Sequence, residues 1–153
     1  LQNDPDIVFV FVGEGAKKEP AQEMAKKTKN CHFFTYVDRD ELPDLLSSFD
    51  CGLVGLNTNQ TGLSVPSKAM GLLSAGVPIL ACCEEETETV QLIKEHQCGE
   101  WVLPNQSDPL AEKIKSLKNS KEKQKKYQNN ALNASETHFS LSQITKQFIE
   151  QLR

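Results

Sequence analysis

The chain has 153 residues, enough for one domain with a sizeable core. It carries 17 Lys and Arg against 21 Asp and Glu, and this net charge of −4 argues against a nucleic-acid-binding surface. No run approaches the roughly 18 apolar residues of a membrane span, and none resembles a signal peptide. The five cysteines lie mostly in apolar runs without CxxC spacing. We therefore expect a cytoplasmic protein with reduced core thiols and neither disulfides nor a zinc site.

Short apolar runs alternate with longer amphipathic ones along the chain, as strands and helices do in βαβ units. The predicted strands cover 7–12, 31–35, 51–56, 78–82 and 100–103, and the predicted helices 18–29, 42–49, 67–75, 87–96, 108–117, 121–134 and 141–152. The pattern predicts an α/β fold, a doubly wound parallel sheet with three C-terminal helices. The residues after the strands should then share the edge where ligands bind in such sheets. They are Gly13, Tyr36, Asn57, Glu84 and Pro104.

The stretch 61–78 (TGLSVPSKAMGLLSAGVP) places a helix start directly after the third strand. A proline suited to the first helical turn and two serines open this helix, and Gly76 and Pro78 end it. Lys68 lies in the first turn, where the helix dipole already presents positive charge, so it costs stability unless an anion offsets it. A diphosphate suits that position. The alternative is that Lys68 points into water and Ser67 only caps the helix.

Four segments that follow one another in order cover most of the chain. They read VFVGEG at 10–15, CHFFTYVDRDELPDLLSSFDCGLV at 31–54, GLSVPSK at 62–68 with SAGVPIL at 74–80, and TETVQLIKEHQCGEWVLP at 87–104. Together they resemble the C-terminal, donor-binding domain of GT-B glycosyltransferases of the large retaining family called group 1 or family 4. The PSK-type subgroup, common in bacterial surface-polysaccharide synthesis, is the nearest pattern. The resemblance implies one Rossmann-like domain over 1–153 that binds a nucleotide-sugar donor.

The resemblance also implies site residues, with a nucleoside-diphosphate sugar as substrate and no metal or other cofactor. The donor diphosphate is assigned to Ser64, Val65, Pro66, Ser67 and Lys68. The nucleotide is assigned to Gly13, Gly15, Tyr36, Val37, Asp38 and Gly71, and the donor sugar to the vicinity of Gly62, Leu63, Thr87 and Glu88.

Each of these assignments has a structural alternative. The two glycines at 13–15 fit a simple tight turn, and residues 36–38 fit a strand-to-helix connector that contacts a nucleotide through its backbone. Asp38 or Asp40 could cap the helix that follows. Thr87 is a candidate N-cap, and the glutamates at 84–88 read as a solvated loop instead of a metal site.

One departure from the family concerns two glutamates, eight positions apart, that many relatives place near the donor sugar and the ribose. Alignment through the SAGVP segment puts Leu63 and Gly71 at those positions. The implied diphosphate contacts therefore remain, whereas the groups that would recognise the sugar and the ribose differ. No catalytic residue is assigned.

The resemblance further implies that the chain is a fragment of a two-domain enzyme. The family's first βα unit and its acceptor-binding N-terminal domain have no counterpart in the sequence. In the order 3-2-1-4-5-6 the first strand is central, so we expect a gap, a rearranged neighbour or a partner there. The isolated fragment should be inactive. We also expect the apolar stripe of the last helix to be partly uncovered, because in the family that helix often crosses to the other domain. The stripe comprises Phe139, Leu141, Ile144, Phe148 and Leu152.

The leading functional hypothesis is a glycosyltransferase of cell-surface polysaccharide or glycolipid synthesis. Its acceptor, a sugar or a lipid-linked glycan, would be held by the N-terminal domain, and no nucleic acid is expected as a partner. A catalytically silent nucleotide-sugar binding module and a GT-B-like nucleotide-sugar epimerase are the alternatives. The lysine-rich run 113–126 fits a solvated helix face or, as a minority reading, a basic face for peripheral association with the inner membrane.

Overall fold

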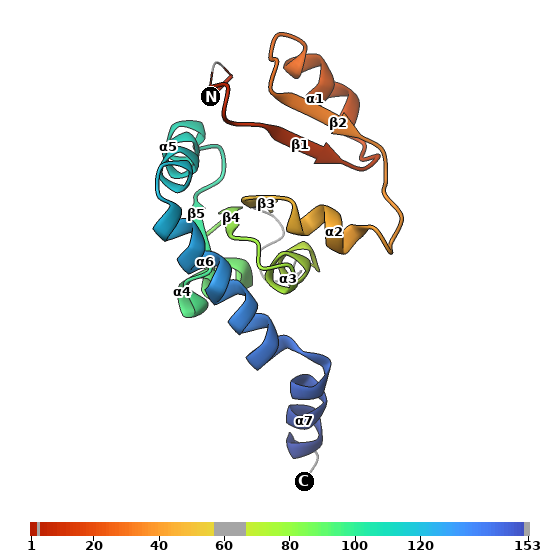
Figure 1. Ribbon diagram of the computed structural model, residues 1–153, viewed down its shortest axis with the longest axis vertical. Helices are drawn as coiled ribbons and strands as arrows, with labels where there is room; N and C mark the ends of the chain where they lie inside the picture. Colours follow the sequence, from red (N-terminus) through yellow and green to blue (C-terminus); the bar gives the residue numbers. More distant parts are fainter. Residues whose placement is uncertain (3, 57–66, 152–153) are drawn as a thin grey trace. The chain divides into compact units, whose positions relative to one another are not determined.

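The computed structural model describes residues 1–2, 4–56 and 67–151, and its elements follow the predicted alternation (Figure 1). The strands are β1 (Phe9–Val12), β2 (Cys31–Phe34), β3 (Gly52–Gly55), β4 (Ile79–Cys82) and β5 (Gly99–Val102). The helices are α1 (Lys18–Ala25), α2 (Leu42–Ser47), α3 (Ser67–Ser74), α4 (Glu88–His96), α5 (Ser107–Lys118), α6 (Lys121–Ala134) and α7 (Leu141–Gln151), with a π-helical turn η2 (Ser135–Phe139) before α7. Every predicted strand and helix is confirmed, with small differences at the ends.

Residues Leu1–Leu42 form one compact unit, in which β1 and β2 pair in parallel and α1 connects them. The rings of Phe11 and Phe33 stack with their centroids 4.7 Å apart. The side-chain amide of Asn30 donates to the Ile7 carbonyl at 2.9 Å and ties the residues that precede β1 to those that precede β2. These two residues are the only buried ones in the described part of this unit, which therefore has little core of its own.

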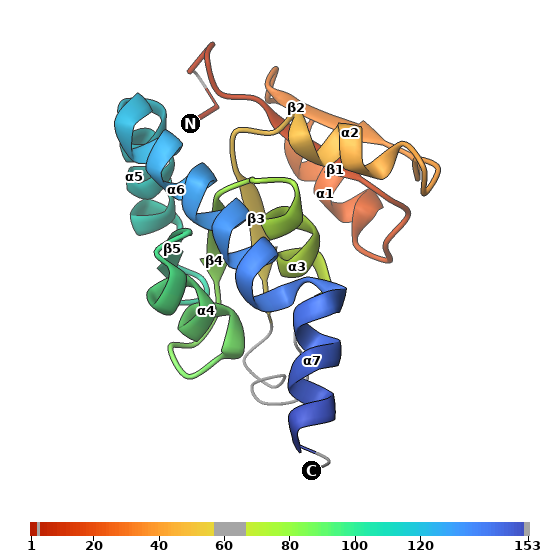
Figure 2. The ribbon, with the colours of Figure 1, turned by 60° about the horizontal axis from the view of Figure 1, so that its bottom comes forward.

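Residues Pro43–Arg153 form the second unit, in which β4 lies between β3 and β5 and all three strands are parallel. Its core fills the space between the sheet and the helices α3, α4 and α6, which Figure 2 shows gathered around the strands. The buried members of this core are Val54, Ala69, Leu72, Leu73, Val77, Ile79, Ala81, Cys83, Val90, Leu92, Ile93, Cys98, Ala131 and Ala134. All five cysteines are free thiols, and Cys83 and Cys98 are the two that are buried.

Helix α3 ends where its sequence predicts. Gly76 adopts a left-handed φ of +67°, and its N–H donates to the Leu73 carbonyl at 3.0 Å. The Val77 N–H donates to the Leu72 carbonyl at 2.9 Å, which completes a Schellman motif. A Cβ on Gly76 would also press on the Leu132 side chain of α6. The glycine thus fixes the end of α3 and the entry into β4.

The five parallel strands form two sheets instead of the single sheet predicted for the fold. β1 pairs only with β2, and β3 pairs only with β4, among the strands that the structure describes. One edge each of β1 and β3 therefore has no strand partner in the described residues.

The C-terminal helices complete the second unit. Helix α6 contacts α3, α4 and α5, while α7 follows η2 at the far end. Along α7, Leu141 is 82% exposed, and Ile144 and Phe148 are also exposed, which confirms the expected uncovered stripe for these residues. Phe139 packs against the core, so the stripe is partly covered and partly uncovered, as expected, and Leu152 lies outside the described residues. None of the described helices is long and apolar enough to cross a membrane.

Candidate functional site

One group of predicted site residues lies in the Pro43–Arg153 unit, at the carboxyl edge of the β3–β4–β5 sheet. Residues 57–66, which follow β3, lie outside the described residues. They include Asn57 and the predicted site residues Gly62, Leu63, Ser64, Val65 and Pro66. Helix α3 then begins at Ser67. Its C-terminal end leads through Val77 into the start of β4, so its N-terminal end lies toward the carboxyl edge of the parallel strands.

The first turn of α3 carries the predicted diphosphate-binding residues Ser67 and Lys68. Both are exposed, whereas Ala69, Leu72 and Leu73 on the same helix are buried against the core. Lys68 forms no ion pair with any described residue, although it adds a cation at the positive end of the helix dipole. Its position is thus open to an anion.

Gly71 lies one turn further along α3 and is half-buried. A Cβ at this position would lie 3.4 Å from the Leu46 side chain of α2. Such a Cβ would make an ordinary van der Waals contact, so packing alone does not require glycine at this position. Contact with a nucleotide stays a prediction.

Helix α4 begins at the same edge and carries Thr87 and Glu88. Thr87 has the extended backbone of an N-cap residue, as predicted, but its buried hydroxyl does not cap the helix. It donates instead to the Glu84 carbonyl at 2.8 Å, because the tight turn before the helix places that acceptor within reach. Glu88 is exposed in the first turn, and Glu85 is held by Lys94 at 2.5 Å.

A separate group of predicted site residues lies in the Leu1–Leu42 unit, at the carboxyl edge of the β1–β2 pair. Gly13 has a φ of +128°, which favours glycine, and its N–H donates to the Phe34 carbonyl at 3.2 Å. The Tyr36 ring lies close to this glycine. A Cβ added to Gly13 would be 3.5 Å from the nearest ring atom. Tyr36 is nevertheless 73% exposed. The carbonyl of Gly15 accepts from the Lys18 N–H at 2.9 Å in the turn that opens α1.

The connector after β2 holds the other two predicted nucleotide contacts. Val37 is half-buried and Asp38 exposed. The Asp38 backbone carbonyl accepts from the Glu41 N–H at 3.0 Å, so the backbone forms a turn here. Neither the Asp38 carboxylate nor that of Asp40 bonds to a described residue, and the predicted cap on the following helix is therefore wrong.

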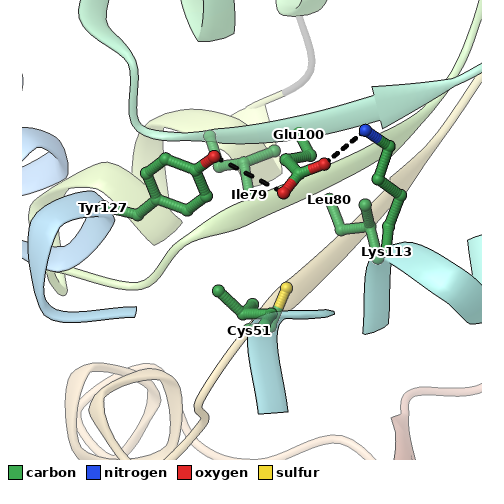
Figure 3. Close-up of a pocket in the computed structure, with 7 residues that line it drawn as sticks. Cys51, Ile79, Leu80, Glu100, Lys113 and Tyr127 are labelled. Atoms are coloured by element: carbon green, nitrogen blue, oxygen red, sulfur yellow. Dashed lines mark hydrogen bonds and ion pairs between the residues drawn. The ribbon is translucent and has the colours of Figure 1, made fainter. Parts of the chain in front are cut away.

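The amino end of the β3–β4–β5 sheet holds a cluster that sequence reasoning missed, shown in Figure 3. Glu100 of β5 accepts from Lys113 of α5 at 2.5 Å and pairs with Lys123 of α6. The Tyr127 hydroxyl donates to the same carboxylate at 3.4 Å. A small pocket beside these groups is lined by Cys51, Ile79, Leu80, Glu100, Lys113, Leu117 and Tyr127.

The electrostatics of this cluster indicate a structural role. Burial would raise the pKa of Glu100, but the hydrogen bonds and charges of Lys113 and Lys123 outweigh burial and lower it. Burial, followed by the charge and the hydrogen bond of Glu100, raises the pKa of Tyr127. Burial also raises the pKa of Cys51 to about 12, with further contributions from the charges of Asp50 and Glu100. The thiol is thus protonated and unreactive at neutral pH. The lysine-rich run 113–126 is visible in the sequence and could have indicated a charged cluster. The sequence does not show, however, that Glu100 is the residue with which its lysines pair.

Residues 1–134 match the family described as glycosyl transferases group 1. The chain belongs to this glycosyltransferase family. Curated relatives include the probable glycosyltransferase WbjE of Pseudomonas aeruginosa, 35% identical over 72% of this chain, and the UDP-glycosyltransferase TURAN of Arabidopsis thaliana, 30% identical over 72%. The putative colanic acid biosynthesis glycosyl transferase WcaI of Escherichia coli is 33% identical over 60% of the chain.

The chain spans about a quarter of the length of these relatives, covering 28%, 23% and 23% of them. Among solved structures, the C-terminal domain of the group 1 glycosyltransferase LpcC from Francisella tularensis aligns over 92% of this chain and 74% of its own, with a TM-score of 0.73 and 19% identity. Anabaena HepE, solved with UDP-glucose, aligns over 97% of this chain and 41% of its own, with a TM-score of 0.76 and 18% identity. The fold is therefore that of the C-terminal domain of GT-B group 1 glycosyltransferases.

Proposed function

We propose that the protein transfers a sugar from a nucleoside-diphosphate sugar to an acceptor, and that this chain supplies the donor-binding half. The match of residues 1–134 to the group 1 family carries the proposal. The carboxyl edges of both parallel sheets add support, since Lys68 and Glu88 are exposed at one edge and Gly13 and Tyr36 lie at the other. Ligands of open α/β sheets bind at such edges.

The proposed chemistry follows from where charge develops. Cleavage of the bond between the anomeric carbon and the diphosphate leaves negative charge on the leaving oxygen. The N-terminal end of α3 and the ammonium group of Lys68 would stabilise that charge more in the transition state than in the ground state. This chain would thus bind and orient the nucleoside diphosphate as it leaves. We assign the predicted residues 64–68 to this role.

The donor sugar and the acceptor are proposed at a coarser level. The solved glycosyltransferase WaaG, which aligns with 86% of this chain at a TM-score of 0.67 and 19% identity, is described as involved in lipopolysaccharide biosynthesis. WcaI is described as a putative glycosyl transferase of colanic acid biosynthesis. A role in cell-surface polysaccharide or glycolipid synthesis is therefore the favoured setting, with acceptor groups contributed by a further domain. Assignment to the PSK-type subgroup belongs to this proposal.

A second candidate is a nucleotide-sugar binding module without turnover. It is favoured by one observation, the presence of Leu63 and Gly71 at the two positions where many relatives carry glutamates.

Binding and turnover separate these candidates. We expect UDP, GDP or another nucleoside diphosphate to raise the melting temperature of the 153-residue chain in a thermal-shift screen, because a ligand of the folded state stabilises it. The nucleoside monophosphate serves as control and should have a smaller effect. Release of the nucleoside diphosphate from its sugar by a longer chain that includes the acceptor domain would identify a transferase. Binding without turnover in that longer chain would favour the silent module, and absence of binding to any nucleotide would refute both.

A further inference from the structure

The turn between β4 and α4 concentrates negative charge at the carboxyl edge of the sheet. Four glutamates lie within five residues here, Glu84, Glu85, Glu86 and Glu88. All but Glu84, which is half-buried, are exposed. Neighbouring carboxylates repel one another, so such a turn tends to open unless other contacts hold it. Among the described residues, only Glu85 of these four forms an ion pair, and its partner is Lys94. The conformation of the turn therefore depends on contacts made from outside it.

Helix α4 holds this turn through two side chains that lie three positions apart and hence on one side of the helix. The Gln91 side-chain amide donates to the Glu85 backbone carbonyl at 3.0 Å. The Lys94 ammonium pairs with the Glu85 carboxylate at 2.5 Å. One residue of the turn is thus fixed at both its backbone and its side chain. We call Glu85, Gln91 and Lys94 the turn clasp.

The turn clasp is itself anchored to the sheet. The Lys94 ammonium lies 5.2 Å from the centre of the Trp101 ring, a cation–π distance, and Trp101 of β5 packs against the core. Inside the turn, the hydroxyl and the N–H of Thr87 both donate to the Glu84 carbonyl, at 2.8 Å and 3.2 Å. These contacts tie the turn to α4 and β5 immediately before Glu88 begins the helix.

We propose that Lys94 and Gln91 are positioning residues for the donor, because they hold the turn that leads through Thr87 to Glu88. This inference rests on the proposed function, in which Thr87 and Glu88 lie near the donor sugar as the family resemblance implies. The side chains of Lys94 and Glu85 are 40% and 56% exposed, and ion pairs so exposed contribute little to global stability. Their effect is local, since a turn already held in one conformation loses less entropy when a ligand binds. Lys94 and Gln91 act through Glu85 and not by touching the donor.

Hydrogen–deuterium exchange of the full, ligand-free chain tests whether the clasp holds the turn. In Lys94→Met the amides of residues 84–90 should exchange about threefold to tenfold faster than in the parent, because the turn opens more often. Lys94→Arg keeps the charge and the contact with the aromatic ring, so it should restore the exchange of the parent. The urea midpoints of both variants should match the parent. Unchanged exchange in Lys94→Met, or a marked fall of its urea midpoint, would overturn the proposal.

Isothermal titration measures the effect on the donor, with the tightest binder among UDP-, GDP-, ADP- and dTDP-glucose as the probe. Lys94→Met, Gln91→Leu and Glu85→Gln should each weaken binding about threefold to tenfold. The double variant Glu85→Gln, Lys94→Met should bind no more weakly than either single variant, because both changes remove the same contact. A lysine that contacted the donor directly would give the opposite sign for Glu85→Gln, since the freed ammonium would bind the diphosphate more strongly.

A matched control keeps the test specific. Lys26→Met removes the partner of Glu23 in the Leu1–Leu42 unit and should leave exchange at 84–90 and donor binding as in the parent. Failure of the parent to bind any of the four probes would count against the proposed function and the positioning role together. Parent-like donor binding in Lys94→Met despite faster exchange, equal weakening by Lys26→Met, or tighter binding by Glu85→Gln would overturn the positioning role alone.

Discussion

The two ends of the β3–β4–β5 sheet differ in whether their charged side chains are paired and buried or exposed. At the amino end, the Glu100 carboxylate is largely removed from water and is satisfied by two lysines and a tyrosine from other helices. At the carboxyl end, Lys68 and Glu88 lie exposed in the first turns of α3 and α4. A satisfied, sequestered cluster fixes the structure, whereas exposed charges at helix starts remain available to a ligand. The contrast indicates a structural role for the amino end and agrees with the binding role proposed for the carboxyl end.

The largest expected effect compares two glycines at the two ends. A Cβ on Gly99, where β5 begins, would overlap the backbone carbonyl of Ile79, whereas a Cβ on Gly55, where β3 ends, would meet open space. We expect Gly99→Ala to lower the free energy of unfolding by about 4 kcal/mol or more, because the β4–β5 pairing must separate. Gly55→Ala should leave stability within about 1 kcal/mol. Urea denaturation measures both, and similar losses would erase the contrast.

Removing the Glu100 charge should have the next largest effect on stability. Glu100→Gln leaves Lys113 and Lys123 without their partner, and we expect a loss of roughly 3 kcal/mol, the upper scale for hydrogen bonds to charged groups. The control Glu88→Gln changes an exposed glutamate at the other end and should cost less than about 0.5 kcal/mol. Equal denaturation midpoints for the two variants would show that the cluster contributes little.

Substitution of Lys68 probes the binding end. Lys68→Ala should weaken nucleoside-diphosphate binding by about 1.5 to 3 kcal/mol, the range for hydrogen bonds to charged groups. Stability without ligand should be unchanged or slightly higher, because the change removes a cation from the positive end of a helix dipole. Isothermal titration and denaturation of the ligand-free chain measure the two effects. Unchanged nucleoside-diphosphate binding, or a marked loss of ligand-free stability, would show that Lys68 does not serve the donor diphosphate.

The pH dependence of the Glu100 cluster should give a smaller effect. The pKa of Glu100 is lowered in the folded chain from its ordinary value of 4.5. Folding is therefore stabilised by the carboxylate above pH 4.5, and this contribution is lost as the pH falls through the lower pKa of the folded state. The stability difference between the parent and Glu100→Gln should thus be constant near neutral pH and shrink in acid. Denaturation at several pH values tests this, and a difference that grows in acid would give the wrong sign.

Part of the candidate site could be predicted because its signals are local. The start of α3 at Ser67 and its end at Gly76 follow from proline, serine and glycine preferences that act within one turn. The same holds for the extended backbone at Thr87 that opens α4. The direction of the Thr87 hydroxyl could not be predicted, because it depends on where the preceding turn places the Glu84 carbonyl.

By itself, the sequence determined the order of strands and helices, their parallel pairing and the family, because apolar periodicity and helix punctuation are properties of neighbouring residues. Only the tertiary structure decided the pairing of Glu100 with Lys113 and Lys123, since it requires β5, α5 and α6 to pack together. Packing also decided that Lys113 and Lys123 are the lysines of 113–126 that reach Glu100, which a sequence cannot show because every lysine carries the same charge. The division into two sheets was likewise settled by backbone pairing between strands, because hydrogen bonds across a sheet depend on neighbours that are distant along the chain.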